Sequence, residues 1–284
     1  MTSVPRIVVG VLAHNEERRI ARCLASLPLG EPDIKVHVIV NGSRDATARI
    51  AAEVGAGRLT VHDWREGGKA RSWNRFVLDT PGIEAEAFVF VDGDAEVLPG
   101  SVEALAAALA ANPDANAAAG MPANGRKAQV YRAGLIAEHG LFGDLYALSG
   151  RFVARMRAQG VRLPEDLIGD DGLLCAMAKT DLADESQWRD ARVVPCLGAQ
   201  FLCEPTRFAS PRSLRVQYRR MINYSVRHFQ NRMISAIMRS TGPSGLPHAM
   251  REIYPQWLSR LAPRRDPKVW WFDRLGLARM RRAV

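Results

Sequence analysis

Short apolar runs rich in β-branched residues alternate with amphipathic stretches along the first 115 residues of the chain. The runs have the length and composition of strands buried in a parallel sheet, and they cover 6–12, 36–40, 59–62 and 88–92. The stretches that follow them predict helices, which cover about 16–27, 45–54, 69–78 and 100–111. This alternation predicts an α/β fold with a Rossmann-like, mostly parallel sheet flanked by helices.

The signals that begin and end these elements weaken toward the C-terminus. Asn15 has the residue type of a helix cap, and Glu16 and Glu17 would then lie in the first turn. Beyond residue 115 the expected elements are a strand at 115–119, a helix near 129–140, an ordered segment at 145–153 and a helix that starts at 170–174.

Charge divides the chain into two unlike parts. The net charge of +9 combines −5 over residues 1–204 (22 Lys+Arg, 27 Asp+Glu) with +14 over residues 205–284 (17 Lys+Arg, 3 Asp+Glu). Such a basic region favours an anionic partner. Because no zinc finger, RNA-recognition motif or basic zipper accompanies it, we expect an anionic membrane surface and no nucleic acid.

The basic region also has helical periodicity. Apolar residues from Leu214 to Ile237 recur at helical spacing with arginines mostly on the other side, and 269–282 mixes aromatic residues with arginines. Both stretches predict a basic, amphipathic helical C-terminal extension. The sequence leaves open whether its apolar face rests on an anionic leaflet or packs against the core.

The rest of the composition is that of a globular protein, with 47% hydrophobic and 24% charged residues. No run of 18 apolar residues, no secretory signal and no C-x-x-C pairing is visible. We therefore expect a cytoplasmic protein that is peripheral on the inner face of the cell membrane, and a homo-oligomer is compatible with the sequence.

Polar residues follow three of the expected strands, at 14–16, 41–45 and 92–94. Ligands of open α/β sheets bind beyond the carboxyl ends of the strands. Neither G-x-G-x-x-G nor a P-loop is present, so the phosphates of a nucleotide would need another partner. Asp92 and Asp94 can supply one by holding Mg²⁺ or Mn²⁺, although D-x-D is also common in solvated turns.

Several segments, taken in order, resemble family 2 glycosyltransferases, which have the GT-A fold. They are VVGVLAHNEERRIARCLASL (8–27), VIVNGSRDATARIA (38–51), GGKARSWN (67–74), FVFVDGDAEVLPGSVEAL (88–105) and LPEDLIGDDGLL (163–174). The segment CEPTRFASPRSLRVQYRRM (203–221) is similar to the closing Q-x-x-R-W segment of that family. The resemblance covers about residues 5–225.

The resemblance implies an inverting, metal-dependent glycosyltransferase of the hexosyltransferase type. It would move a sugar from a UDP- or GDP-linked donor to a hydroxyl of an acceptor glycan or of a lipid-linked acceptor. The implied division of the chain is a nucleotide-sugar-binding half at 1–95, an acceptor-binding half with the catalytic base at 96–204, and the basic helical region at 205–284.

Individual roles carry over to the positions that match. The implied donor-binding residues are Ala13, Asn15, Glu16, Asn41, Lys69, Asn74 and Asp92, and the implied metal ligands are Asp94 and Asp92. Asn41 is a departure, because the family commonly has a base-reading aspartate there. An amide both donates and accepts, so the nucleobase stays undetermined. Lys69 would offset phosphate charge, or it is a solvated loop lysine.

The resemblance also implies the catalytic base. Asp171 matches the family's general base, and Asp170 stands in place of the usual glutamate. A carboxylate within hydrogen-bond reach can take the proton of an acceptor hydroxyl, and a single base without a protein nucleophile implies inversion. Two carboxylates at a helix start are also common as caps.

The closing segment departs from the family at one position. Gln217 and Arg220 match Q-x-x-R-W and would lie near the donor diphosphate, whereas Met221 replaces the tryptophan. This replacement, together with the lack of an apolar run long enough to cross a bilayer, speaks against a synthase that extrudes a polymer.

Two other classes of protein stay open. A nucleotidyltransferase would share the fold and the metal, but it should begin with a Gly-rich loop where this chain has Ala13-His14-Asn15. A non-catalytic nucleotide-binding or membrane-adaptor protein would tolerate the loss of Asp94 or Asp171. Both carboxylates are present, which favours the transferase.

Overall fold

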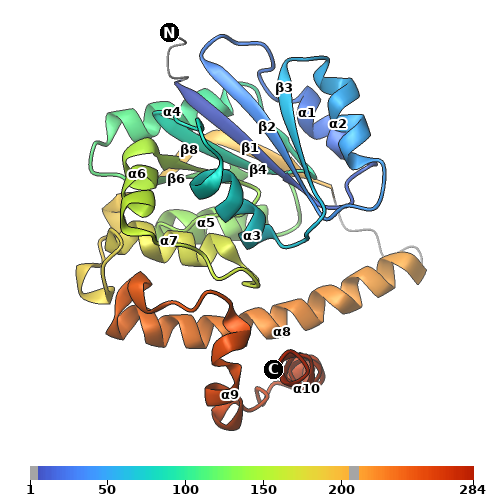
Figure 1. The fold of residues 1–284 in the computed structure, drawn as a ribbon, viewed down its shortest axis with the longest axis vertical. Helices are drawn as coiled ribbons and strands as arrows, with labels where there is room; N and C mark the ends of the chain where they lie inside the picture. The colour runs from blue at the N-terminus through green and yellow to red at the C-terminus, as the bar shows by residue number, and fades with distance from the viewer. Residues whose placement is uncertain (1–5, 205–210) are drawn as a thin grey trace.

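The computed structural model describes residues 6–204 and 211–284 of the chain. A single eight-stranded sheet, with the strand order β3-β2-β1-β4-β7-β6-β8-β5, forms the centre of the molecule (Figure 1). Helices cover both of its faces, and a long C-terminal helix crosses below them. The predicted α/β class with flanking helices is confirmed.

The first half of the sheet is parallel throughout. Strands β3, β2, β1 and β4 lie side by side in the same direction, so their carboxyl ends meet at one edge. All seven residues of β1 are buried, which explains its continuous apolar run. The bounds are Ile7–Ala13 for β1, Ile34–Asn41 for β2, Leu59–Trp64 for β3 and Ala87–Asp92 for β4.

The second half of the sheet is mixed. Strand β7 runs antiparallel to β4 and to β6, β6 is parallel to β8, and β5 is antiparallel to β8. The start of β7 therefore lies beside the carboxyl end of β4. The bounds are Ala95–Val97 for β5, Ala117–Pro122 for β6, Leu145–Ser149 for β7 and Val193–Cys203 for β8.

The helices form two layers because successive residues of each strand face opposite sides of the sheet. One layer buries the apolar sides of α1 (Ile20–Ala25), α2 (Thr47–Gly55) and α4 (Ser101–Ala111) against the sheet. The other layer contains α3 (Lys69–Asn74), α5 (Ala128–Glu138), α6 (Gly150–Gln159) and α7 (Asp170–Thr180). A π-helical turn, Arg75–Asp79, continues α3.

The structure corrects one local prediction and adds detail that the sequence did not give. Asn15 does not cap a helix: its backbone is left-handed, with φ 57°, and α1 begins four residues later than predicted, at Ile20 after Arg19. The segment at 145–153 is a strand followed by a helix. Strand β8 was not predicted, because Pro195 and Gly198 interrupt its pattern and a β-bulge shifts its register against β6.

The C-terminal region is helical, as predicted. Helix α8 (Pro211–Ser240) is followed by α9 (Tyr254–Trp257) and by α10 (Pro267–Arg281), which packs against α8. From Val226 onward the apolar side of α8 belongs to the core, whereas residues 214–216 and 218–220 are exposed on turns that project past the α/β part (Figure 1). Packing in the core therefore accounts for the later turns of α8 but not for its first ones.

A hollow of about 590 Å³ lies between α10 and residues 261–263. Its walls include Trp270 and Trp271, which are 40% and 54% exposed, and the arginines Arg274 and Arg281. Within the described ranges, no helix is long and apolar enough to cross a bilayer. Part of the predicted closing segment, residues 205–210, lies outside the described residues.

Candidate active site

The loops that follow β1 and β2 are joined to each other. The backbone N–H of Asn15 donates to Ser43 Oγ at 2.9 Å, and the N–H of Arg44 donates to Asn15 Oδ1 at 2.9 Å. The N–H of Glu16 donates to Thr47 Oγ1 at 2.8 Å. Because these bonds cross between the ends of two neighbouring strands, they hold the two loops together as one wall of the site at the carboxyl edge of the sheet.

Asn41, at the end of β2, is buried within this wall. Its side-chain nitrogen donates to the carbonyl oxygen of Ala13 at 3.1 Å, and its side-chain oxygen accepts from the N–H of Gly68 at 3.4 Å. The side chain is 4% exposed. Its amide thus already connects β1, β2 and the loop before α3, which leaves it little capacity to read a nucleobase.

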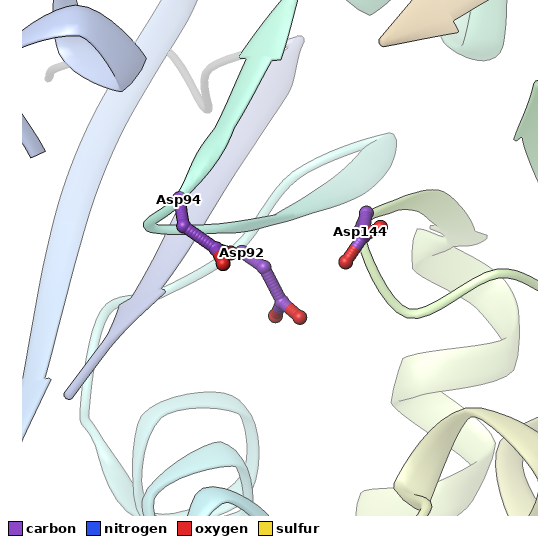
Figure 2. Close-up of side chains that lie close together, drawn as sticks. All are labelled: Asp92, Asp94 and Asp144. Atoms are coloured by element: carbon purple, nitrogen blue, oxygen red, sulfur yellow. The ribbon is translucent and has the colours of Figure 1, made fainter. Parts of the chain in front are cut away.

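Three carboxylates gather at the end of β4. Asp92 ends the strand, Asp94 follows in the turn, and Asp144 approaches from the loop before β7 (Figure 2). One ligand oxygen from each lies within 4.8 Å of the others. The glycine between the first two is needed there, because a Cβ on Gly93 would lie 2.9 Å from the Cβ of Ala13.

The electrostatics of this carboxylate cluster favour a cation. Burial raises the pKa of Asp92 well above its usual range; Lys69 opposes this rise and Asp144 adds to it. Burial also raises the pKa of Asp144, and Asp94 contributes. Carboxylate oxygens are the ligands that Mg²⁺ and Mn²⁺ prefer. The residues present therefore fit a divalent cation.

Lys69, the first residue of α3, connects the carboxylate cluster with α7. Its Nζ lies 2.7 Å from Asp92 Oδ1 and 3.7 Å from Asp170 Oδ2. Burial alone would lower the pKa of Lys69, but Asp170 and Asp92 together raise it well above its usual range. Because two carboxylates hold its ammonium group at the start of a helix, Lys69 is not a solvated loop lysine.

The acid pair begins α7, directly after Gly169, whose φ is 95°. Asp170 is buried and faces Lys69. Asp171 Oδ1 accepts from Arg227 Nη2 of α8 at 2.9 Å. Its other oxygen faces Gly143: a Cβ placed there would lie 3.7 Å from Asp171 Oδ2 and 3.4 Å from Lys69 Nζ. The two carboxylates thus point to different partners.

A second cation lies on the other side of the carboxylate cluster. Arg19 Nε donates to Glu16 Oε2 at 2.7 Å, and Arg19 Nη1 donates to Asp94 Oδ2 at 3.2 Å. Burial raises the pKa of Glu16 to about 7, with a contribution from Asp94, although Arg19 acts in the opposite direction. Two cationic groups, Arg19 and Lys69, therefore flank the cluster.

A packed aromatic floor lies next to Lys69, with which Tyr146 interacts. The ring of Phe90 stacks on Tyr146 with centroids 5.0 Å apart and lies 5.5 Å from Trp73. All three rings are essentially buried. Burial, together with the charge of Asp170, raises the pKa of Tyr146 well above its usual range. The floor is therefore neutral and closely packed, which strengthens the charge interactions above it.

The structure brings half of the twelve predicted site residues together around the carboxylate cluster. Those that share contacts around the carboxylate cluster are Glu16, Lys69, Asp92, Asp94 and Asp170, and Asp171 lies beside Gly143 at its margin. Asn74 is elsewhere, because its buried amide pairs with the backbone N–H and C=O of Leu163. Among the described residues, neither Gln217 nor Arg220 contacts a site carboxylate, and Arg220 is exposed on α8.

Three residues of the site were not predicted from the sequence. Asp144 directly precedes an apolar strand, and it would have been found only with the knowledge that β7 is antiparallel to β4. Arg19 lies on the turn before α1, and nothing in its spacing connects it with Asp94. Arg227 belongs to an arginine-rich helix, in which no pattern distinguishes it from its neighbours.

The chain is similar in sequence to known proteins. Residues 8–164 match the sequence profile described as "Glycosyl transferase family 2". Protein RfbJ of Shigella flexneri is 32% identical over 88 residues, which make up 31% of this chain and 64% of RfbJ. The match thus spans less than two thirds of the length of that relative.

Solved structures share the fold. A mannosyltransferase of Pyrobaculum calidifontis, solved with GDP-Man and Mn²⁺, is 21% identical and has a TM-score of 0.61. The match covers 100% of this chain and 77% of the mannosyltransferase chain. Glucosyl-3-phosphoglycerate synthase of Mycobacterium tuberculosis, with Mn²⁺, UDP and phosphoglyceric acid, is 20% identical with a TM-score of 0.51, covering 78% of each chain. S. aureus TarS with UDP-GlcNAc is 14% identical with a TM-score of 0.53, covering 98% of this chain and 81% of TarS.

Proposed function

Because the chain belongs to glycosyltransferase family 2, we propose that it transfers a sugar from a nucleoside-diphosphate donor to an acceptor hydroxyl with inversion at the anomeric carbon. Asp92, Asp94 and Asp144 hold Mn²⁺ or Mg²⁺ in this proposal, and Asp171 is the general base. The observation that carries it is the placement of three carboxylates at the end of β4, connected through Lys69 to the acid pair of α7.

Each residue has a distinct task in the proposed reaction. The divalent cation, when bound, neutralises charge on the donor diphosphate. Asp171 Oδ2 takes the proton of the acceptor hydroxyl as the new C1–O bond forms on one face of the sugar. The bond from C1 to the diphosphate oxygen breaks on the opposite face, which inverts the anomeric carbon. Lys69 and Arg19 supply positive charge close to the departing diphosphate.

The donor is proposed to be a UDP- or GDP-sugar bound by residues 1–95, with the acceptor held by 96–204. The contacts support a wall built from Ala13, Asn15 and Glu16. They reduce the support for direct donor contacts by Asn41 and Asn74, whose amides serve the fold. Among the described residues neither Gln217 nor Arg220 contacts a carboxylate of the site, so we leave both out of the proposed site.

An acceptor anchored at an anionic membrane fits the C-terminal region, and we place this partner in the same proposal. The +14 charge of residues 205–284 complements an anionic leaflet. The hollow lined by Trp270, Trp271 and Arg274 offers apolar rings beside cations, which is the combination that interfacial helices use. The protein would associate peripherally, on the inner face of the cell membrane.

Nucleotide binding and turnover test the proposal together. We expect Mn²⁺ or Mg²⁺ to be required for UDP or GDP to raise the melting temperature. A panel of UDP- and GDP-sugars, each assayed for release of the nucleoside diphosphate with glycan and lipid-linked acceptors, should then identify the donor. The matched control is the same panel in EDTA, in which release should stop.

Other outcomes would favour the other protein classes. Stabilisation by nucleoside triphosphates and not by diphosphates, with release of pyrophosphate, would indicate a nucleotidyltransferase. Binding of nucleotide without turnover of any donor would indicate a non-catalytic module. Metal-independent binding of diphosphates would contradict the role of the carboxylate cluster.

A further inference from the structure

The loop that delivers the proposed base has no regular structure of its own. Residues 161–169 connect α6 to α7 without a strand or a helix, so their backbone groups need partners from elsewhere. On the side of α3, the amide of Asn74 pairs with the N–H and C=O of Leu163 at 3.0 and 2.7 Å. The partners on the opposite side come from the C-terminal region.

Gln230 of α8 is the centre of these partners. Its Oε1 accepts from the N–H of Ile168 at 2.9 Å, and its Nε2 donates to the carbonyl oxygen of Asp166 at 3.1 Å and to the hydroxyl of Tyr254 at 2.9 Å. The side chain is 0% exposed. Because both N–H groups and the oxygen are engaged, the amide can hold the loop in only one orientation.

Arg227 lies one turn earlier on the same side of α8 and contacts the end of the loop. It pairs with Asp171 Oδ1, and a Cβ on Gly169 would overlap its guanidinium group. Gly169 thus permits a close approach as well as the left-handed backbone that starts α7. With one oxygen of Asp171 held by Arg227, the other is directed to the side of Gly143 and Lys69.

We propose that Arg227 and Gln230 are positioning residues, through which α8 sets the place and orientation of Asp171. The C-terminal region then completes the active site instead of being an appendage to it. This inference rests on the proposed role of Asp171 as general base. It adds a dependence of the chemical step on two α8 side chains that do not touch the donor.

A double-mutant cycle tests the inference. We expect Arg227→Met to lower kcat by roughly 10²-fold, since small misplacements of a reacting group cost that much, while donor KM and the metal-dependent thermal shift by UDP or GDP stay within about twofold of the wild-type values. Arg227→Lys should recover part of the loss, and added guanidinium should partly rescue Arg227→Ala. In an Asp171→Asn background, Arg227→Met should have no further effect, because it acts through Asp171.

Matched variants separate positioning from folding. Arg232→Met removes an exposed arginine of the same helix and should leave kcat unchanged. Gln230→Leu should lower kcat and leave donor KM unchanged, measured at a temperature where circular dichroism shows that the variant is folded. If Gln230→Leu does not fold, Tyr254→Phe is the alternative, because it removes one of the three hydrogen bonds of Gln230. It should show a smaller loss of kcat, again with an unchanged donor KM.

The outcomes also separate this inference from the proposed function. If Asp171→Asn keeps full activity, the assignment of the base fails. If Asp171→Asn is crippled but the effect of Arg227→Met is equally large in both backgrounds, Asp171 is the base and the positioning role is wrong. A rise in donor KM with unchanged kcat would assign Arg227 to donor binding and overturn the inference.

Discussion

Carboxylates with the same chemistry differ in this protein through their surroundings. The Asp92 side chain is 24% exposed and forms a close ion pair with Lys69 at 2.7 Å, whereas the Asp94 side chain is 33% exposed, follows the strand in a turn and lies 3.2 Å from Arg19 Nη1. Asp94 therefore contributes less to packing, and its carboxylate is the more exposed of the two. It is the residue whose replacement should separate metal binding from folding.

Asp94→Asn is expected to abolish transfer and the metal-dependent thermal shift by UDP or GDP, because a neutral amide lacks the negative charge with which the carboxylate attracts a divalent cation. The melting temperature without ligand should stay within a few degrees of the wild-type value. Asp33→Asn, which changes an exposed aspartate at the amino end of β2, is the control and should keep full activity. Full activity of Asp94→Asn, or of the wild-type protein in EDTA, would refute the metal role.

Asp171→Asn keeps the size of the side chain but removes its ability to accept a proton. Because general-base catalysis contributes roughly 10²–10⁴-fold, kcat should fall within that range while donor affinity holds. Asp170→Asn is the companion variant, since Asp170 faces Lys69 and not Arg227. If only Asp170→Asn shows a loss of this size, Asp170 and not Asp171 is the base.

The predictability of single residues follows from where their partners lie. Asp92 and Asp94 could be predicted because they end a strand that the sequence already indicates. Asp144 could not, since its approach depends on the direction in which β7 pairs with β4. Asn41 and Asn74 match the family pattern at donor-binding positions, yet buried amides also serve backbone groups, and only the fold tells the two uses apart.

Among the helices, α10 depends on one buried ion pair. Asp273 is fully buried and accepts from Arg264 Nε and Nη2 at 2.9 and 2.7 Å. Burial alone would raise the pKa of Asp273, but the bonds from Arg264 and Ser225 lower it to about 2. The pair therefore joins α10 to the loop before it, and the bond from Ser225 joins Asp273 to α8.

Asp273→Asn should lower the free energy of unfolding at pH 7 by about 1–2 kcal/mol, after allowance for the partial exposure of Arg264. Because the pKa is lower in the folded state, the wild-type advantage is complete above about pH 4 and is lost as the pH falls toward 2. The difference in stability is measured from the urea midpoints of the wild-type protein and of Asp273→Asn between pH 7 and pH 3. Asp114→Asn, which changes an exposed aspartate, is the control. A difference that stays constant over this range would contradict the assigned cause.

The predictability of the elements follows from their pattern of burial. The strands β1, β2 and β4 are nearly continuous apolar runs because both faces are covered. Strand β8 alternates irregularly around a proline and a bulge, so its sequence resembles a loop. The change to antiparallel pairing after β4 is a property of the chain path, which no local pattern records.

For the molecule as a whole, charge separates the α/β part from the C-terminal region. The protein should sediment with vesicles that contain anionic lipid at low salt, because basic residues near such a surface contribute about 1 kcal/mol each. Release is expected at high salt, where the Debye length falls from about 10 Å at 0.1 M to about 3 Å at 1 M. Neutral vesicles should recruit the protein poorly.

The hollow on α10 supplies the variant for this experiment. The double variant Trp270→Ala and Trp271→Ala should bind anionic vesicles more weakly, whereas Trp188→Ala, at an exposed tryptophan of the α/β part, should not. Deletion of residues 265–284 is a poor test, because Leu277 and Met280 are part of the core. Equal binding to neutral and anionic vesicles, or none to either, would assign the arginines to another partner.

The length of α8 has a consequence for the acceptor. The helix has 30 residues and Arg227 lies 16 residues after its start at Pro211, which places the base about 24 Å from the exposed end. If that end rests on a membrane surface, the length of the helix sets an upper limit to the distance between the surface and the base. An acceptor hydroxyl that lies within about 24 Å of the surface is inside this limit, whereas the far end of a longer glycan would have to fold back toward the surface to reach the base.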